Sequence, residues 1–118
     1  MTINELKSFL SRFHIRPNKL MGQNFLLSDN VLDQIVKAAY LNQKDRVLEI
    51  GPGLGFLTHR LAETAGEVLA VEKDRKLCQA LRKLLKRHKN VKVICADALF
   101  IEPETYNLQL TTYKLVAN

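Results

Sequence analysis

The sequence predicts an α/β protein built on a parallel sheet, and three observations point to this class. Short apolar runs that suit buried strands alternate with segments whose apolar residues recur at helical spacing. A glycine-rich turn directly follows the first of these runs. The chain has 118 residues, 47% of them hydrophobic and 25% charged, which is typical of one small globular domain and excludes a disordered tail.

The first 45 residues are predicted to form a helical arm. A threonine and a glutamate with capping-box spacing precede apolar residues at helical spacing, so we predict a helix over residues 3–14. Residues 17–27 begin with Pro17 and show neither period, so we expect a loop there. A second helix is predicted to begin at the capping residues 28–30.

From residue 46 onward, strands and helices alternate, as they do in parallel sheets with helical crossovers. We expect residues 98–111 to be irregular or weakly helical, and the chain to be an N-terminal piece of a longer protein, because its fourth strand ends at the terminus. The predicted strands cover residues 46–50, 68–71, 91–96 and 115–117, and the predicted helices cover residues 56–64 and 74–88.

The glycine-rich turn carries the first functional signal. It reads Glu49-Ile-Gly51-Pro-Gly53-Leu-Gly55 and joins a strand to a helix, where glycines let a ligand approach the backbone. A dinucleotide fingerprint would need a third glycine where Phe56 stands, and a P-loop would need a lysine that is absent. A turn that only packs helix against strand remains the alternative.

Acidic residues follow the next two predicted strands. Because the carboxyl ends of parallel strands share one edge, Glu49, Glu72, Asp97 and Asn118 should line up beside the glycine turn. Glu72 could accept both hydrogen bonds of a ribose diol, and Asp97 could accept one from an adenine amino group. The alternative for each is a surface acid or a helix cap. The position of Asp74 favours a helix cap. Together the acids favour a ligand with an adenosine and a cationic group such as a sulfonium.

Five motifs, taken in order, resemble those of the ribosomal RNA adenine N6,N6-dimethyltransferases of the KsgA/Erm type. This family belongs to the class I methyltransferases that depend on S-adenosylmethionine. The first motif is the most specific, whereas the glycine motif is shared across the wider superfamily. The motifs are Gly22-Gln-Asn-Phe-Leu26, Leu48-Glu-Ile-Gly-Pro-Gly-Leu-Gly55, Val71-Glu-Lys-Asp74, Ala96-Asp-Ala98 and Val116-Ala-Asn118.

The resemblance implies a Rossmann-like class I fold, with residues 46–118 as the first half of the S-adenosylmethionine-binding domain and residues 1–45 as the arm. It also implies that Asn118 is catalytic, its side-chain oxygen accepting a hydrogen bond from the exocyclic amine of a flipped adenosine. The Pro and aromatic residue that complete this motif in the family are absent, so residues 1–118 alone should not methylate. The implied cofactor-binding residues are Asn24, Leu26, Gly51, Glu72, Asp97 and Asn118.

The implied function is transfer of methyl groups from S-adenosylmethionine to adenosines of small-subunit ribosomal RNA in ribosome biogenesis. The implied partner is ribosomal RNA or the small ribosomal subunit, and we expect a cytoplasmic monomer without metal. Two alternatives stay open: a class I methyltransferase for another substrate, and a non-catalytic nucleic-acid-binding relative. No apolar run approaches the roughly 18 residues of a membrane span.

Positive charge is concentrated in one stretch of the chain. The formal charge is +6, and residues 73–92 hold nine Lys and Arg but one acid. This stretch is either a solvated helix face or a contact for RNA phosphates. Phe9 and Phe13 either pack the first helix onto the core or belong to an RNA-facing arm. We expect Cys78 and Cys95 to be two reduced, buried thiols.

Overall fold

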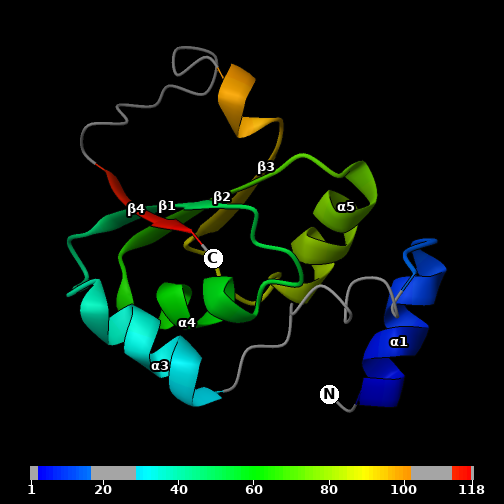
Figure 1. The fold of residues 1–118 in the computed structure, drawn as a ribbon, viewed down its shortest axis with the longest axis horizontal. Coiled ribbons are helices and arrows are strands. Elements are labelled where there is room, and N and C mark those ends of the chain that lie inside the picture. Colours follow the sequence, from blue (N-terminus) through cyan, green and yellow to red (C-terminus); the bar gives the residue numbers. More distant parts are fainter. Residues whose placement is uncertain (1–2, 17–28, 102–112, 118) are drawn as a thin grey trace.

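The computed structural model describes residues 3–16, 29–101 and 113–117, which form a four-stranded parallel sheet with helices (Figure 1). This architecture confirms the predicted α/β class. In chain order the elements are α1 (Ile3–Arg12), α3 (Asp29–Ala38), β1 (Arg46–Ile50), α4 (Phe56–Thr64), β2 (Glu67–Glu72), α5 (Arg75–Leu84), β3 (Val91–Cys95), the 3-10 turn η1 (Ala98–Phe100) and β4 (Tyr113–Ala117).

The strand order in the sheet is β3-β2-β1-β4, and every neighbouring pair is parallel. Helix α4 connects β1 to β2, and α5 connects β2 to β3. Ile50 lies opposite both Val71 and Ala117, while Glu72 lies opposite Cys95. The four strands therefore end level with one another, which brings the residues that follow them to one edge.

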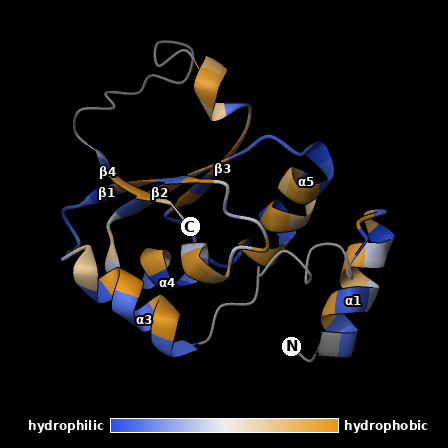
Figure 2. Cartoon of the chain, in the orientation of Figure 1, coloured by the Kyte–Doolittle hydropathy of each residue, from blue (hydrophilic) through white to orange (hydrophobic). Residues whose placement is uncertain are grey.

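Helices α3, α4 and α5 cover one face of the sheet (Figure 1). Each of them carries both hydrophobic and hydrophilic residues, which the helical period places on different sides of the helix (Figure 2). Among the described residues, the opposite face carries a second cluster around Leu69, Val71 and Ile94, and Leu115 remains 65% exposed there. The cluster under α3 and α4 contains Leu32, Val47, Leu57, Leu61, Ala62, Ala65, Val68 and Val116.

Helix α1 packs on α5 and on the glycine turn rather than on the sheet. Leu6 and Leu10 are buried against Leu54 of the turn and Leu77 and Ala80 of α5. The rings of Phe9 and Phe13 are half-buried against the same cluster, with their centroids 5.0 Å apart. The interpretation that these phenylalanines pack the helix on the core is therefore confirmed.

The predicted boundaries agree with the structure to within two residues except at the end of α5, which was predicted to reach residue 88 and ends at Leu84. Beyond Leu84 the backbone forms tighter bonds between residues three apart, such as the one from the His88 N–H to the Leu85 carbonyl (3.0 Å). The side chain of Asn90 then donates to the carbonyls of Ala62 (2.8 Å) and Ala65 (3.2 Å). This tertiary contact draws the chain out of the helix and into β3.

The expectation of two reduced thiols is wrong. Cys78 of α5 and Cys95 at the end of β3 form a disulfide, with their Cα atoms 5.8 Å apart. Helix α5 packs directly on β3, and its buried side turns Cys78 toward the sheet. The pairing depends on this rotation of the helix, which a separation of 17 residues in the sequence does not reveal.

Gly66 makes the turn between α4 and β2 possible. Its N–H donates to the carbonyl of Asp45 (3.0 Å), and a Cβ at this position would stand 2.1 Å from the carbonyl oxygen of Gln43. We expect Gly66→Ala to lower the free energy of unfolding by about 2 kcal/mol, because backbone must move to admit the methyl group. Urea denaturation would measure the change, and Lys44→Ala, an exposed substitution in the facing turn, should stay within about 0.5 kcal/mol of the parent. Equal stability of all three proteins would contradict the prediction.

Candidate functional site

The candidate site lies where the parallel strands end. The sheet hydrogen bonds continue one step beyond the strands, from the Gly51 N–H to the Val71 carbonyl (3.0 Å) and from the Ala96 N–H to the Glu72 carbonyl (2.9 Å). Gly51 and Glu72 are therefore neighbours across the sheet, and Asp97 follows on the next strand. Three of the residues singled out in the sequence thus share one edge, which we call the carboxyl rim.

The glycines of the turn have different structural roles. Gly51, Gly53 and Gly55 all have positive φ, at 68°, 59° and 82°. A Cβ on Gly55 would stand 3.0 Å from the Leu81 side chain, so this glycine allows the turn to pack closely on α5. A Cβ on Gly51 would meet nothing within 4 Å. The packing interpretation therefore explains Gly55, whereas the open space at Gly51 leaves its backbone accessible to a ligand.

Glu72 is a buried carboxylate with one oxygen to spare. The residue is 7% exposed, and its Oε2 accepts a hydrogen bond from the Asp74 N–H (3.0 Å). Within the described part of the chain, Oε1 accepts none. Every fully buried side-chain N or O atom of the described residues has a hydrogen-bond partner. Because Oε1 has none, it is not fully buried and reaches the surface. An anchored carboxylate with a free oxygen is well suited to accept hydrogen bonds from a diol.

Asp97 and Asp74 both cap helical turns. Asp74 accepts from the N–H groups of Lys76 (2.9 Å) and Leu77 (3.1 Å), as its position ahead of α5 predicted. Asp97 accepts from the Leu99 N–H (2.9 Å) through Oδ1 and so begins η1. The capping geometry fixes the direction of the Asp97 carboxylate while its Oδ2 makes no hydrogen bond to any described residue.

Glu49 does not join the other acids at the rim. It is 1% exposed, enclosed between the sheet and α4, and its Oε2 accepts a hydrogen bond from the Thr58 hydroxyl (2.5 Å). Burial raises the pKa of Glu49 to about 7, against the lowering effect of that hydrogen bond. Thr58, which is fully buried, was missed in the sequence, although its position among the apolar residues of the predicted helix 56–64 was the available signal.

The remaining predicted site residues, Asn24, Leu26 and Asn118, lie outside the described residues. The opposite face of the sheet carries an apolar cavity of about 290 Å³, which the rim residues do not line; it is formed by Leu48, Ile50, Val71, Ala98, Ile101, Tyr113 and Leu115. In the described ranges, no three His, Cys, Asp or Glu side chains are arranged to hold a metal ion. No helix there has the length and apolarity needed to cross a bilayer.

Comparison with known proteins identifies the family of the chain. The family model described as ribosomal RNA adenine dimethylase matches residues 15–118. The chain belongs to this family. Two curated relatives are named ribosomal RNA small subunit methyltransferase A: one from Pelotomaculum thermopropionicum is 44% identical over 96% of this chain, and one from Dehalococcoides mccartyi is 43% identical over 97%. The chain spans about 40% of the length of these relatives, 41% of the first and 39% of the second.

Solved structures of this family share the fold. The crystal structure of the 23S rRNA methyltransferase ErmE superposes with a TM-score of 0.63 at 40% identity and covers 66% of this chain and 32% of ErmE. A dimethyladenosine transferase from Plasmodium falciparum gives a TM-score of 0.66 at 29% identity, over 79% of this chain and 32% of that protein. The Rossmann-like methyltransferase fold predicted from the sequence is therefore confirmed.

The buried Glu49 makes stability depend on pH. An unfolded glutamate ionises near pH 4.5, whereas folding holds the pKa of Glu49 at about 7. As the pH rises between these values, the unfolded chain loses its proton first, so the free energy of unfolding falls, by about 3 kcal/mol in total. In Glu49→Gln, which keeps an acceptor for Thr58, this component of the fall should vanish. Urea denaturation at pH 5 and pH 8 would measure it.

A matched control is Glu67→Gln, which removes a carboxylate whose side chain is 42% exposed and whose ion-pair partner is Arg46 rather than a histidine. This variant should retain the pH dependence of the parent protein between pH 5 and pH 8. If Glu49→Gln instead follows the parent at both pH values, the proposed burial cost of the Glu49 charge is refuted.

Proposed function

We propose that this chain supplies the S-adenosylmethionine-binding part of an adenine dimethyltransferase that acts on small-subunit ribosomal RNA. The family match over residues 15–118 supports adenine dimethylation as the reaction. The choice of the small-subunit RNA is supported by the curated relatives that bear this name and align with 96% and 97% of the chain. The partner is then the small ribosomal subunit. The protein binds it as a monomer in the cytoplasm.

The observation that carries the proposal is the meeting of Gly51 and Glu72 at the carboxyl rim. Gly51 offers open backbone, and Glu72 offers an anchored carboxylate whose free oxygen reaches the surface. These residues fit an adenosine whose ribose diol donates to Glu72 while the rest of the ligand crosses Gly51. S-adenosylmethionine, when bound, supplies an activated methyl group on a sulfonium, and negative charge at the rim favours that cation over a phosphorylated nucleotide.

The other assigned residues complete this site. Asp97, through its free Oδ2, accepts from the adenine amino group, and Asn24 and Leu26 contact the cofactor from the arm formed by residues 1–45. Asn118 orients the exocyclic amine of the target adenosine by accepting a hydrogen bond from it, so that the nitrogen lone pair faces the methyl group. Residues 46–118 are then the first half of the cofactor-binding domain.

The role of Glu72 can be tested by calorimetric titration with S-adenosylmethionine. Glu72→Gln keeps an acceptor for the Asp74 N–H but loses the charge, so the affinity should fall at least about tenfold, the typical value of a hydrogen bond to a charged group. Glu63→Gln, an exposed carboxylate on α4, serves as the matched control and should bind as the parent does. Unchanged affinity in Glu72→Gln would disprove the ribose assignment.

A further inference from the structure

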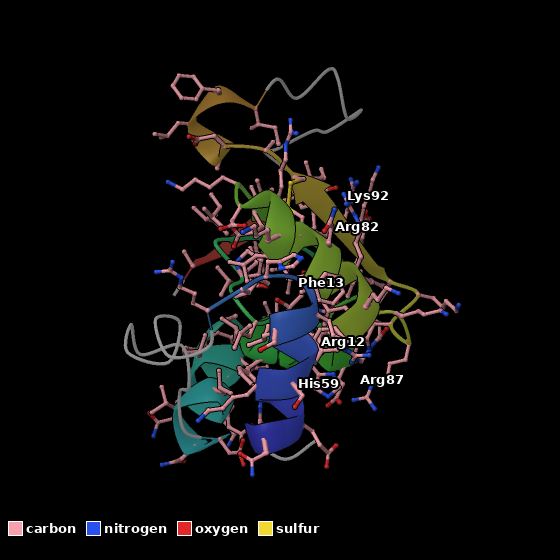
Figure 3. All side chains as sticks on the ribbon, turned by 90° about the vertical axis from the view of Figure 1, so that its right-hand side faces the viewer. Arg12, Phe13, His59, Arg82, Arg87 and Lys92 are labelled. Carbon is pink, nitrogen blue, oxygen red and sulfur yellow. A yellow bond between two sulfur atoms is a disulfide. The ribbon has the colours of Figure 1, made fainter. Side chains whose placement is uncertain are left out.

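A dense group of cations covers the far end of α5 and the start of β3. We call it the basic face and define it as Arg82, Lys83, Lys86, Arg87, Lys89 and Lys92, all of which are exposed. Figure 3 looks onto this side of the molecule and shows Arg82 close to Lys92, with Arg87 near His59. The apolar side of α5, which includes Leu77 and Leu81, is buried, so the helix directs its cations outward.

The cations of the basic face are not neutralised by the protein itself. Elsewhere the chain pairs its cations with acids: Arg46 with Glu67 (3.0 Å), and Lys114 with Asp45 (3.2 Å). Arg60 likewise pairs with two aspartates of α3. Across residues 3–16, 29–101 and 113–117, by contrast, no carboxylate forms an ion pair with any of the six basic-face side chains. The charge is therefore available to an external anion.

Two arginines of the basic face are held in place. Arg82 donates through Nη2 to the carbonyl of Val93 (3.3 Å), which ties α5 to β3. The Arg87 Nη2 lies 2.7 Å from the Nε2 of His59, which in turn lies 3.1 Å from a carboxylate oxygen of Glu63. Burial, followed by the charges of Arg87 and His88, holds the pKa of His59 below its usual value. The charge of Arg87 contributes to this lowering and the neighbouring Glu63 opposes it, so Arg87 acts electrostatically on His59 at this end of the basic face.

The basic face is remote from the carboxyl rim. Helix α5 starts beside Glu72, where Asp74 caps it, and its ten residues carry the chain about 15 Å away from the rim. Lys89 precedes β3 and Lys92 lies near its beginning, at the opposite edge of the sheet from the strand ends. A ligand that occupies both places must therefore span at least this distance, as a folded RNA does.

The surroundings of the basic face favour a polyanion over a membrane or a protein. The exposed large hydrophobic side chains of the described residues are Val31, Tyr40, Phe56, Leu99, Phe100 and Leu115, and none belongs to residues 73–97. Membrane-binding helices insert apolar side chains, and the central residues of protein interfaces are commonly aromatic. A surface with cations alone matches the phosphate backbone of a nucleic acid, which is recognised by charge.

We infer that the basic face binds the phosphate backbone of structured RNA, as a second contact separate from the methyl-transfer site. This inference rests on the proposed function, because it assumes that the bound macromolecule is the RNA substrate. The contact adds affinity and orientation without reading sequence, since phosphates are the same along every RNA strand. It would hold one part of a folded RNA at the far end of α5 while another part reaches the carboxyl rim.

The test uses an RNA duplex of about 16 base pairs, a length that a double-stranded RNA-binding domain spans. Binding would be followed by fluorescence anisotropy across a series of KCl concentrations. The variant Lys83→Gln/Lys86→Gln removes two exposed cations that make no structural hydrogen bond among the described residues. We expect it to bind at least about tenfold more weakly near 0.1 M salt, and the slope of log K against log salt to become shallower by about 1 to 2.

The matched control is Lys37→Gln/Lys44→Gln, which removes the same charge from exposed positions on α3 and the turn after it. It should lose less than about threefold in affinity, since net charge alone acts weakly through salt. Equal losses in the two double variants would overturn the inference, because the binding would then follow net charge. No loss in Lys83→Gln/Lys86→Gln would overturn it too. Circular dichroism would check that each variant folds.

Two further measurements separate the alternatives. Vesicles of phosphatidylserine and phosphatidylcholine test a membrane role: tighter binding to them than to RNA, lost in Lys83→Gln/Lys86→Gln, would overturn the inference. Calorimetric titration with S-adenosylmethionine reports on the proposed function alone, and the same double variant should match the parent there. Failure to bind this cofactor would count against the proposed function, whereas failure of the RNA experiment would count against the basic face only.

Discussion

The arrangement of the candidate site depends on the parallel register of the sheet. Ile50 is paired on both sides, with Val71 of β2 and Ala117 of β4, so the central strand sets the level at which its neighbours end. Hydrogen bonds from Gly51 and Ala96 continue the pairing beyond the strands and hold the following loops. A slip by one residue would turn Glu72 to the other face of the sheet, and the carboxyl rim would cease to exist.

The contacts beneath the rim explain why the glycine turn is held so closely. Gly55 lies against Leu81 of α5, and Leu54 is buried with Leu10 of α1. The turn therefore packs on both helices, while Gly51 faces open space. Glu49 joins the sheet to α4 through Thr58 and does so at the cost of a buried carboxyl. One short motif thus divides into residues that pack against the helices and Gly51, whose backbone is open to the proposed ligand.

The basic face and the carboxyl rim lie at opposite ends of α5, so this helix fixes the distance between them. Its first turn is capped by Asp74 beside Glu72, and its last turn carries Arg82 and Lys83, where the helix dipole favours cations. Acidic groups therefore gather where a sulfonium is proposed to bind, and basic groups gather where RNA phosphate is proposed to bind. Lys73, Arg75 and Lys76 also stand at the rim end of α5, so the two ends differ in the carboxylates of the rim and not in an absence of cations there.

Local patterns determined the α/β class, the strand at 46–50, the helix at 56–64 and the grouping of Gly51, Glu72 and Asp97, because periodicity and parallel strand ends are readable without a structure. The binding and catalytic roles of all six assigned residues stay predictions. Only the tertiary structure decided the end of α5, the Cys78–Cys95 disulfide and the burial of Glu49. Each of these depends on how a helix is rotated and seated on the sheet, a property of contacts between residues distant in sequence that no local pattern contains.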